Sequence, residues 1–319
     1  MVIIESTDEE EYDTSLLVII VDTNIYSWGN RILQMSNKTE STSSTKLGSS
    51  LIGFNTFVEH LMVFINLHLM LNQENQIAVI SSQIGEARFL FPEPHQSQST
   101  KSEQKSIQNI ILGKLLHLDT TIKETNQEST SSNFSAALSL SLCYINRIKK
   151  EVPIIRPRIF VLNISPDASS QYISVMNCIF SAQKQSIPLD TCILSQQDST
   201  FLQQASHLTN GIYLKPQRQE NLSQYLISTF LMDTYSRKLL QCPTLKSVDY
   251  RATCFCHKRI VDIGFVCSVC LSIFCSYSSS CSTCGTKFSL KIEIPKSRKS
   301  LSQPSSQEQP TNNKDKVEY

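Results

Sequence analysis

The sequence predicts an α/β fold: a doubly wound, mostly parallel six-stranded sheet with an antiparallel edge strand, followed by a small cysteine-rich module. Three observations lead to this prediction. A continuous apolar run at 16–21 is typical of a strand that helices bury on both faces. Strand and helix patterns alternate through the second half of the chain, which favours right-handed crossovers in a parallel sheet. Seven of the 11 cysteines lie between Cys254 and Cys284.

The first half of the chain contains the centre of the predicted sheet. The run 16–21 is the first strand, and we expect Asp22, which follows it, to cap a turn. The Ser/Thr-rich segment 36–50 is expected to be a loop. The segment 54–71 is apolar on nearly all sides, which predicts a helix packed deeply against the sheet.

Two strands at 76–82 and 87–91 flank a short turn with Gly85, which predicts a hairpin at the sheet edge. The polar segment 93–106 is expected to be a loop. The elements predicted after it are a helix at 133–149, a strand at 158–164, a helix at 172–183, a strand at 188–194, a helix at 201–208, a strand at 211–214 and a helix at 222–240.

Two CxxC turns in the cysteine-rich region have the spacing of a zinc site. Cys267 and Cys270 form the first turn, and Cys281 and Cys284 form the second. Each turn points two thiolates toward one position, and together they supply the tetrahedral sulfur set that Zn²⁺ prefers. Four sulfur ligands leave no open coordination position, so the predicted zinc is structural rather than hydrolytic.

Four further ligands remain in this region: Cys254, Cys256, His257 and Cys275. They are candidates for a second site in a cross-braced arrangement. Alternatively, Cys254 and Cys256 pair with the Cys267 turn in one site, and spacing alone does not decide between the two arrangements. The other cysteines lie in apolar surroundings and are expected to be buried, reduced thiols: Cys143, Cys178, Cys192 and Cys242.

Composition limits the classes of partner. The 29 basic and 28 acidic residues nearly balance, so no strong global field attracts nucleic acid or a membrane. The acidic N-terminus lacks a secretory signal, and the longest apolar stretch, 61–71, is shorter than the ~20 residues of a membrane span. These features predict an intracellular, reducing compartment, where clustered cysteines bind metal more often than they form disulfides.

Asp22 is a candidate metal ligand, because it ends a predicted strand and ligands of doubly wound folds bind at the carboxyl ends of the strands. An adhesion-type metal site has the pattern DxSxS, whereas this chain places Asn24 and Tyr26 at the two serine positions. The phenol removes a hydroxyl ligand and is expected to fill its space. We therefore expect Asp22 to cap the turn or pair internally rather than to bind a metal.

The alternative function is a PIN-type endoribonuclease that uses Asp22, since a strand ending in DTN is typical of that class. Glu59 on the first predicted helix is a candidate second carboxylate. Phosphodiester cleavage of this kind needs several carboxylates converging on Mg²⁺, and too few acids lie at the predicted strand ends.

Two segments together resemble one family. The strings LLVIIVDTNIYSWG (16–29) and YRATCFCHKRIVDIGFVCSVCLSIFC (250–275), with CSTCGTKF (281–288) after them, are similar to the small von Willebrand factor A subunit of transcription factor IIH. The second string is long and unusual, and the strand–helix order between the segments suits the same family. The resemblance therefore covers about 12–290.

The resemblance implies a von Willebrand factor A-like domain with a degenerate metal site and no enzymatic activity. It implies a zinc-binding module, here on Cys267, Cys270, Cys281 and Cys284. It also implies a structural subunit of the nuclear transcription factor IIH core complex, bound to the larger subunit with von Willebrand A and RING domains. That complex acts in RNA polymerase II initiation and nucleotide excision repair, so DNA is expected to be met only through the complex.

The predicted organisation has four parts. They are an acidic tail at 1–13, the von Willebrand factor A-like domain at 14–242, the zinc module at 243–295 and a disordered polar tail at 296–319. Whether the basic stretch 287–299 contacts DNA is left open. The aromatic residues near the predicted zinc are candidates for partner contacts or for the module core: Phe265, Phe274 and Tyr277.

Overall fold

The structure is a computed structural model that describes most of the two folded regions. The described residues are 14–39, 51–92, 107–117, 131–233, 236–243, 248, 250–257 and 259–288. Several predictions fall outside them: the tails 1–13 and 296–319, the loop 93–106, and most of the loop 36–50 and of the basic stretch 287–299.

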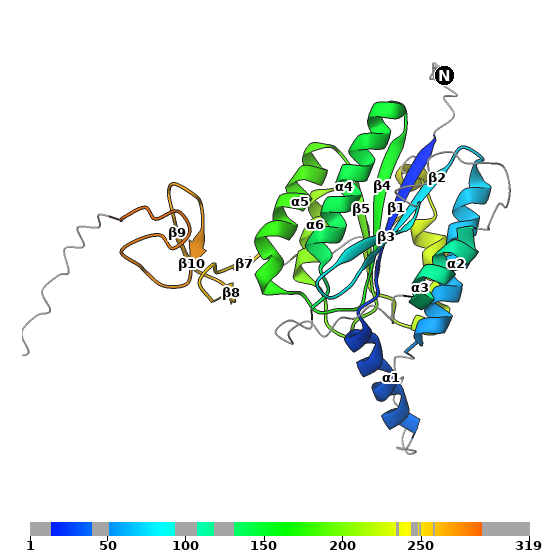
Figure 1. Ribbon diagram of the computed structural model, residues 1–319, viewed down its shortest axis with the longest axis horizontal. Coiled ribbons are helices and arrows are strands. Elements are labelled where there is room, and N and C mark those ends of the chain that lie inside the picture. The colour runs from blue at the N-terminus through cyan, green and yellow to red at the C-terminus, as the bar shows by residue number, and fades with distance from the viewer. Residues whose placement is uncertain are drawn as a thin grey trace, which may run out of the picture.

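Six strands form one sheet in the order β3-β2-β1-β4-β5-β6. The central strand β1 (Ser15–Asp22) pairs in parallel with β2 (Gln76–Ser82) and with β4 (Arg156–Asn163) (Figure 1). Beyond β4, β5 (Leu189–Ile193) and the short β6 (Tyr213–Leu214) continue the parallel pairing. The prediction of a mostly parallel six-stranded sheet is confirmed.

The sheet edge is antiparallel, as predicted. The strand β3 (Ala87–Phe91) pairs antiparallel with β2, and Gly85 in the turn before it has a left-handed φ of 75°. Such a φ favours glycine, because the Cβ atom of any other residue makes unfavourable contacts with the backbone in this conformation.

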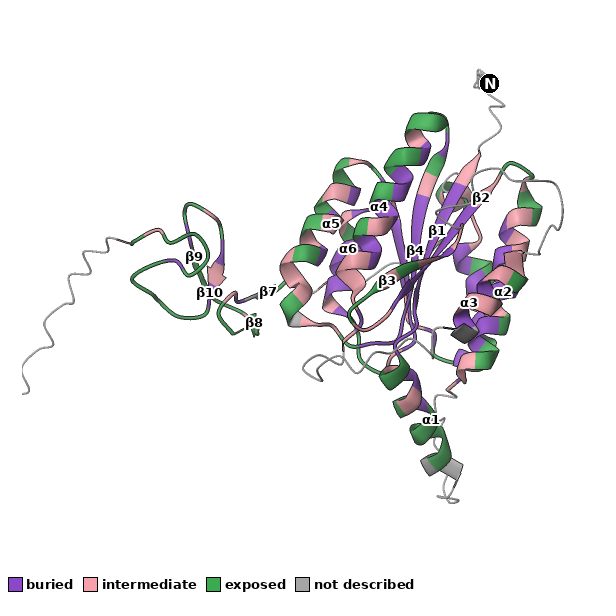
Figure 2. Ribbon diagram, in the orientation of Figure 1, coloured by how far each residue is buried: buried purple, intermediate pink, exposed green. Residues whose placement is uncertain are grey.

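The strand β1 is buried on both faces because helices cover both sides of the sheet. Its residues 16–21 are at most 1% exposed, and alternate side chains enter different cores. Figure 2 shows the buried strands between half-buried helices. Leu17, Ile19 and Val21 pack in one core, and Leu16, Val18 and Ile20 pack in the other.

Two helical layers cover the sheet (Figure 1). On one face lie α2 (Phe54–Leu71), α3 (Ile107–His117) and α7 (Leu222–Tyr225); on the other lie α4 (Phe134–Glu151), α5 (Tyr172–Lys184) and α6 (Thr200–Leu208). The helix α2 is long and apolar enough to cross a membrane by length and composition. In this fold it packs Phe57, Leu61 and Phe64 into the core. Short 3₁₀ turns precede α5 and α7 at Ser169–Gln171 and Gln219–Asn221.

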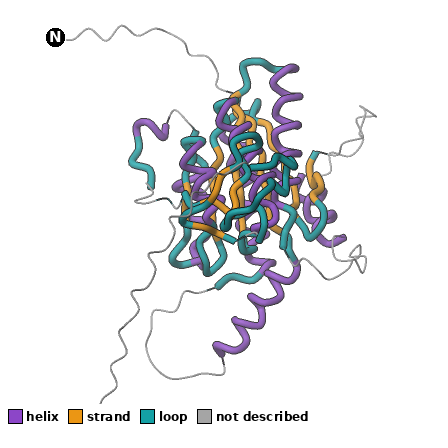
Figure 3. The backbone as a smooth tube through the Cα atoms, turned by 90° about the vertical axis from the view of Figure 1, so that its left-hand side faces the viewer, coloured by secondary structure: helices purple, strands orange, loops and turns teal. Residues whose placement is uncertain are grey.

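The structure corrects the segment that follows β1. A helix, α1 (Ile25–Thr39), begins where we predicted a turn and extends into the predicted loop; Figure 3 shows it projecting from the body. Asn24 starts it, because its Oδ1 accepts hydrogen bonds from the backbone N–H groups of Tyr26 (3.0 Å) and Ser27 (3.4 Å). Trp28 is buried against two rings of α2. The helix α3 was also not predicted.

The predicted helix at 222–240 is interrupted. After α7 come a π-helical turn at Leu226–Phe230 and a separate short helix, α8 (Ser236–Leu239). Arg158 Nη1 donates to the carbonyl of Met232 at 2.7 Å, and Arg237 of α8 binds the buried Asp190 through two hydrogen bonds of 2.8 and 2.6 Å. The predicted straight helix is therefore interrupted at the point where this part of the chain contacts the buried ionic cluster.

The cysteine-rich module is built from short antiparallel strand pairs. The strand β7 (Ala252–Thr253) pairs with β8 (Ile260–Val261), and β9 (Phe265–Val266) pairs with β10 (Ile273–Phe274). Tyr250 leads into the module and contacts His207 of α6 through ring packing and a hydrogen bond.

Candidate metal centre

The two CxxC turns have the same backbone structure. The backbone N–H of Cys267 donates to the carbonyl of Ser272 at 2.9 Å, and that of Cys281 donates to the carbonyl of Thr286 at 2.8 Å. The residue after each turn also donates back to the first cysteine, at 2.9 Å in both turns. Each turn is therefore a closed knuckle with both thiols on one side.

Each knuckle ends in a left-handed residue. Gly285 adopts a φ of 75°, which a glycine accepts without strain. Leu271 occupies the equivalent position with a φ of 60°, and its side chain is 69% exposed. A leucine in this conformation is strained, because its Cβ lies close to the following carbonyl oxygen.

The structure pairs the thiols of the two knuckles. The Sγ atoms of Cys267 and Cys284 are 3.7 Å apart, and those of Cys270 and Cys281 are 3.5 Å apart. Tetrahedral zinc with Zn–S bonds of about 2.3 Å places its sulfurs about 3.8 Å apart, whereas a disulfide requires about 2.05 Å. All four sulfurs lie within 4.8 Å of one another, so this group can hold a metal ion.

Hydroxyl groups lower the pKa values of two of these thiols. The Ser272 hydroxyl lies 3.1 Å from Cys270 Sγ and lowers the pKa of that thiol to about 6. The Thr286 hydroxyl lies 3.1 Å from Cys284 Sγ and lowers its pKa in the same way. Metals bind the thiolate, so both hydrogen bonds favour the ligating form.

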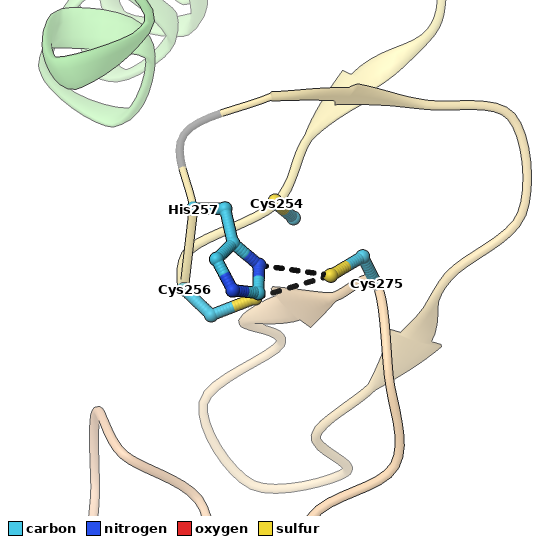
Figure 4. Close-up of side chains that lie close together, drawn as sticks. All are labelled: Cys254, Cys256, His257 and Cys275. Carbon is cyan, nitrogen blue, oxygen red and sulfur yellow. Dashed lines mark hydrogen bonds between the residues drawn. The ribbon is translucent and has the colours of Figure 1, made fainter.

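The structure also brings the remaining ligands of this region together as a second group (Figure 4). Cys254, Cys256, His257 and Cys275 contribute ligand atoms that all lie within 4.8 Å of one another. In the structure the Cys267 turn faces the Cys281 turn, and not Cys254 and Cys256 as in the alternative arrangement.

The scattered cysteines are only partly as predicted. Cys192 is buried, and burial raises the pKa of its thiol far above the usual value. Cys178 and Cys242 are half-buried, but Cys143 is exposed on α4, so the prediction of a buried thiol there is wrong. The 3.6-residue repeat of that helix turns Cys143 to solvent while its neighbour Leu142 packs inward.

Of the three aromatic candidates in the module, one is core and two are surface. Phe274 is 6% exposed and packs with Cys267 and Cys281. Phe265 and Tyr277 are about half exposed and pack edge-on against each other. The module also exposes other apolar side chains, among them Ile263 at 88% and Val269 at 65% exposure.

The carboxylate of Asp22 joins the carboxyl ends of β1 and β4. It accepts hydrogen bonds from the backbone N–H groups of Asn24 (3.1 Å), Ile164 (3.2 Å) and Ser165 (2.7 Å). The residue is 3% exposed, and this burial raises the pKa of its carboxyl although the hydrogen bonds act in the opposite direction. The prediction that Asp22 pairs internally is confirmed.

The residues proposed around Asp22, and Asp167, the acid that follows β4, do not complete a metal site. Tyr26 is 55% exposed, so the expectation that its phenol fills the serine position is wrong; it stands on the outer face of α1. Glu59 is exposed on α2. Asp167 caps α6 by accepting from Thr200 Oγ1 (3.0 Å) and from the backbone N–H of Phe201 (3.2 Å). Of these groups, Asp167 is thus used locally, whereas Tyr26 and Glu59 face solvent.

Comparisons with known proteins were consistent with one another. The family model described as "Transcription factor Tfb4" matches residues 14–285. General transcription factor IIH subunit 3 of Dictyostelium discoideum is 57% identical and covers 90% of this chain and 92% of its own length. The general transcription and DNA repair factor IIH subunit TFB4 of Arabidopsis thaliana is 38% identical over 86% of this chain and 89% of its own.

A solved structure also matches. The TFIIH p34 N-terminal domain superimposes with a TM-score of 0.56 and 26% identity, and the alignment covers 67% of this chain and 97% of that domain.

Proposed function

Since the chain belongs to the transcription factor Tfb4 family, we propose that it is a non-catalytic structural subunit of a transcription factor IIH core complex. In that role it supports RNA polymerase II initiation and nucleotide excision repair in the nucleus. The chain combines a von Willebrand factor A-like domain with a metal-binding module. It meets DNA only through the complex.

The observation that carries this proposal is the match along both regions of the chain. The family model runs from the start of β1 to the second knuckle, so it includes the α/β domain and the cysteine-rich module in one unit. The Asp22 carboxylate is occupied by three backbone N–H groups, which agrees with a non-catalytic role for the carboxyl ends of the strands. The nuclease alternative is not favoured.

We further propose that the chain binds the larger subunit with von Willebrand A and RING domains. The exposed apolar side chains of the module suit such a contact, because buried apolar and aromatic groups dominate interface energies. The residues are Ile263, Phe265, Val266, Val269 and Leu271.

We propose that Zn²⁺ stabilises the module that carries these apolar side chains. Its ligands are Cys267, Cys270, Cys281 and Cys284. The donor set and its sulfur separations fit a structural zinc ion. Zinc bound there replaces the hydrophobic core that a module of this size lacks.

Affinity purification of the tagged full-length chain from nuclei tests the proposal. We expect core subunits of the complex to co-purify with the wild type, with Asp22→Asn and with the surface control Cys143→Ser. Cys267→Ser is expected to lose them, because the module unfolds without its metal. Incubation of each protein with RNA and Mn²⁺ is the second readout. RNA cleavage that disappears in Asp22→Asn, or purification without any complex subunit, refutes the proposal.

A further inference from the structure

The module contains three knuckles rather than two, and the third one does not follow the CxxC pattern. The backbone N–H of Cys254 donates to the carbonyl of Arg259 at 2.8 Å, which is the same five-residue closure found after Cys267 and Cys281.

One antiparallel residue pair encloses each knuckle at the same positions. The pairs are Thr253 with Ile260, Val266 with Ile273, and Ser280 with Lys287. Each pair lies one residue outside the closing hydrogen bond. The three turns are therefore structural repeats, although the sequence repeats CxxC only twice.

His257 occupies the position of the second cysteine in its knuckle. It stands three residues after Cys254, where the other knuckles carry their second cysteines, Cys270 and Cys284. The pair Cys254–His257 is thus a knuckle of the form CxxH. The backbone N–H of Arg259 lies 3.5 Å from Cys254 Sγ, as a donor to a thiolate does.

Two further thiols, those of Cys256 and Cys275, bring the ligands at this knuckle to four (Figure 4). Cys275 Sγ lies 3.5 Å from Cys256 Sγ and 3.1 Å from His257 Nδ1. Zinc bonded at about 2.3 Å to sulfur and 2.05 Å to nitrogen separates such ligands by about 3.8 and 3.6 Å, so a small outward movement accommodates the ion. The sulfur separation is far too long for a disulfide bond.

We propose that Cys254, Cys256, His257 and Cys275 bind a second Zn²⁺, so that the module holds two zinc ions with interleaved ligands. In the sequence, Cys275 lies between the two CxxC knuckles of the first site. The other three ligands of its own site precede both of those knuckles. The two sites are also joined directly, because the backbone N–H of Phe255 donates to the carbonyl of Ile273 at 2.7 Å. Each ion therefore holds segments that carry ligands of the other. The proposal does not depend on membership of the complex.

Native mass spectrometry of the full-length chain, with zinc counted per chain, tests the proposal. We expect two zinc ions in the wild type and in the control Cys143→Ser, and at most one in the double variant Cys256→Ser/Cys275→Ser. One zinc in the wild type, or two in the double variant, overturns the second site. So does a denatured, non-reduced mass that shows a disulfide between Cys256 and Cys275. A single zinc would leave the proposed function intact.

The variant His257→Cys keeps the test valid if the double variant does not fold. We expect it to retain two metal ions, because it converts CxxH into the CxxC of the other knuckles. After Co²⁺ replacement, its thiolate-to-metal charge-transfer absorbance should rise by about one-seventh, since eight thiolates then bind where seven did. An unchanged Co²⁺ spectrum in His257→Cys shows that His257 is not a ligand and refutes the assigned set.

Discussion

The buried His68 should make the stability of the α/β domain depend on pH. It lies on α2 at 2% exposure, and among the described residues neither ring nitrogen has a hydrogen-bond partner of normal geometry. Burial, together with the positive charge of Arg158, lowers the pKa of His68 to about 4. The substitution His68→Leu tests this, because it replaces the imidazole with an apolar side chain of similar size.

The magnitude follows from the two pKa values. The unfolded chain binds a proton at His68 near pH 6.5, whereas the folded chain does so only near pH 4. The folded-state pKa is depressed, so stability is full above pH 6.5, falls as the pH decreases toward 4, and is constant below that. The loss due to His68 is about 2 kcal/mol between pH 8 and pH 5, and about 3 kcal/mol once the pH is below 4.

Urea unfolding at pH 8, 6 and 5 measures this loss. The fluorescence of Trp28 is a clean probe, because it is the single tryptophan of the chain and is buried in the α/β domain. Metal release from the module at low pH therefore leaves the readout unaffected. We expect His68→Leu to lose about 2 kcal/mol less than the wild type between pH 8 and pH 5. Equal losses in the two proteins would refute the assignment.

Three other substitutions test separate features. Asp22→Ala should lower the free energy of unfolding in urea by about 3 kcal/mol, because three backbone N–H groups lose their acceptor; Asp22→Asn, which keeps one acceptor oxygen, should cost less. Arg237→Ala should also cost about 3 kcal/mol, because it removes two hydrogen bonds from the fully buried Asp190. Leu271→Gly should strengthen zinc binding about fivefold in a chelator competition, since it removes about 1 kcal/mol of left-handed strain.

Each of these has a result that contradicts it. A fully stable Asp22→Ala variant would mean that water replaces the carboxylate at no cost. Unchanged urea unfolding of Arg237→Ala would show that α8 does not hold the domain. Weaker zinc binding in Leu271→Gly would show that the leucine side chain supports the module, in spite of its exposure.

The sequence predicted most of the sheet, because burial on both faces leaves a local signature. The run 16–21 is apolar without interruption, and the structure buries every one of its residues. The hairpin at 76–82 and 87–91 was equally visible, since a glycine turn separates its two strands. By contrast, α1 was missed because the capping Asn24 looks like an ordinary turn residue, and the segment it starts is polar over much of its length.

The break in the predicted helix at 222–240 had no local cause. It depends on Arg158, Asp190 and Arg237, which are far apart in the chain and meet only in the folded domain. A straight helix would take Arg237 away from the buried Asp190, and the loss of one charged partner from a buried ion cluster is destabilising.

In the module, the amino-acid sequence by itself determined the kind of ligands, since thiols and an imidazole at knuckle spacing suit zinc. Only the tertiary structure decided how eight ligands separate into two groups. A knuckle closes within six residues, so its spacing is local, whereas its partner is whichever knuckle the strand pairs place opposite it. Cys275 shows the difference: it lies between the ligands of one group in sequence and belongs to the other in space.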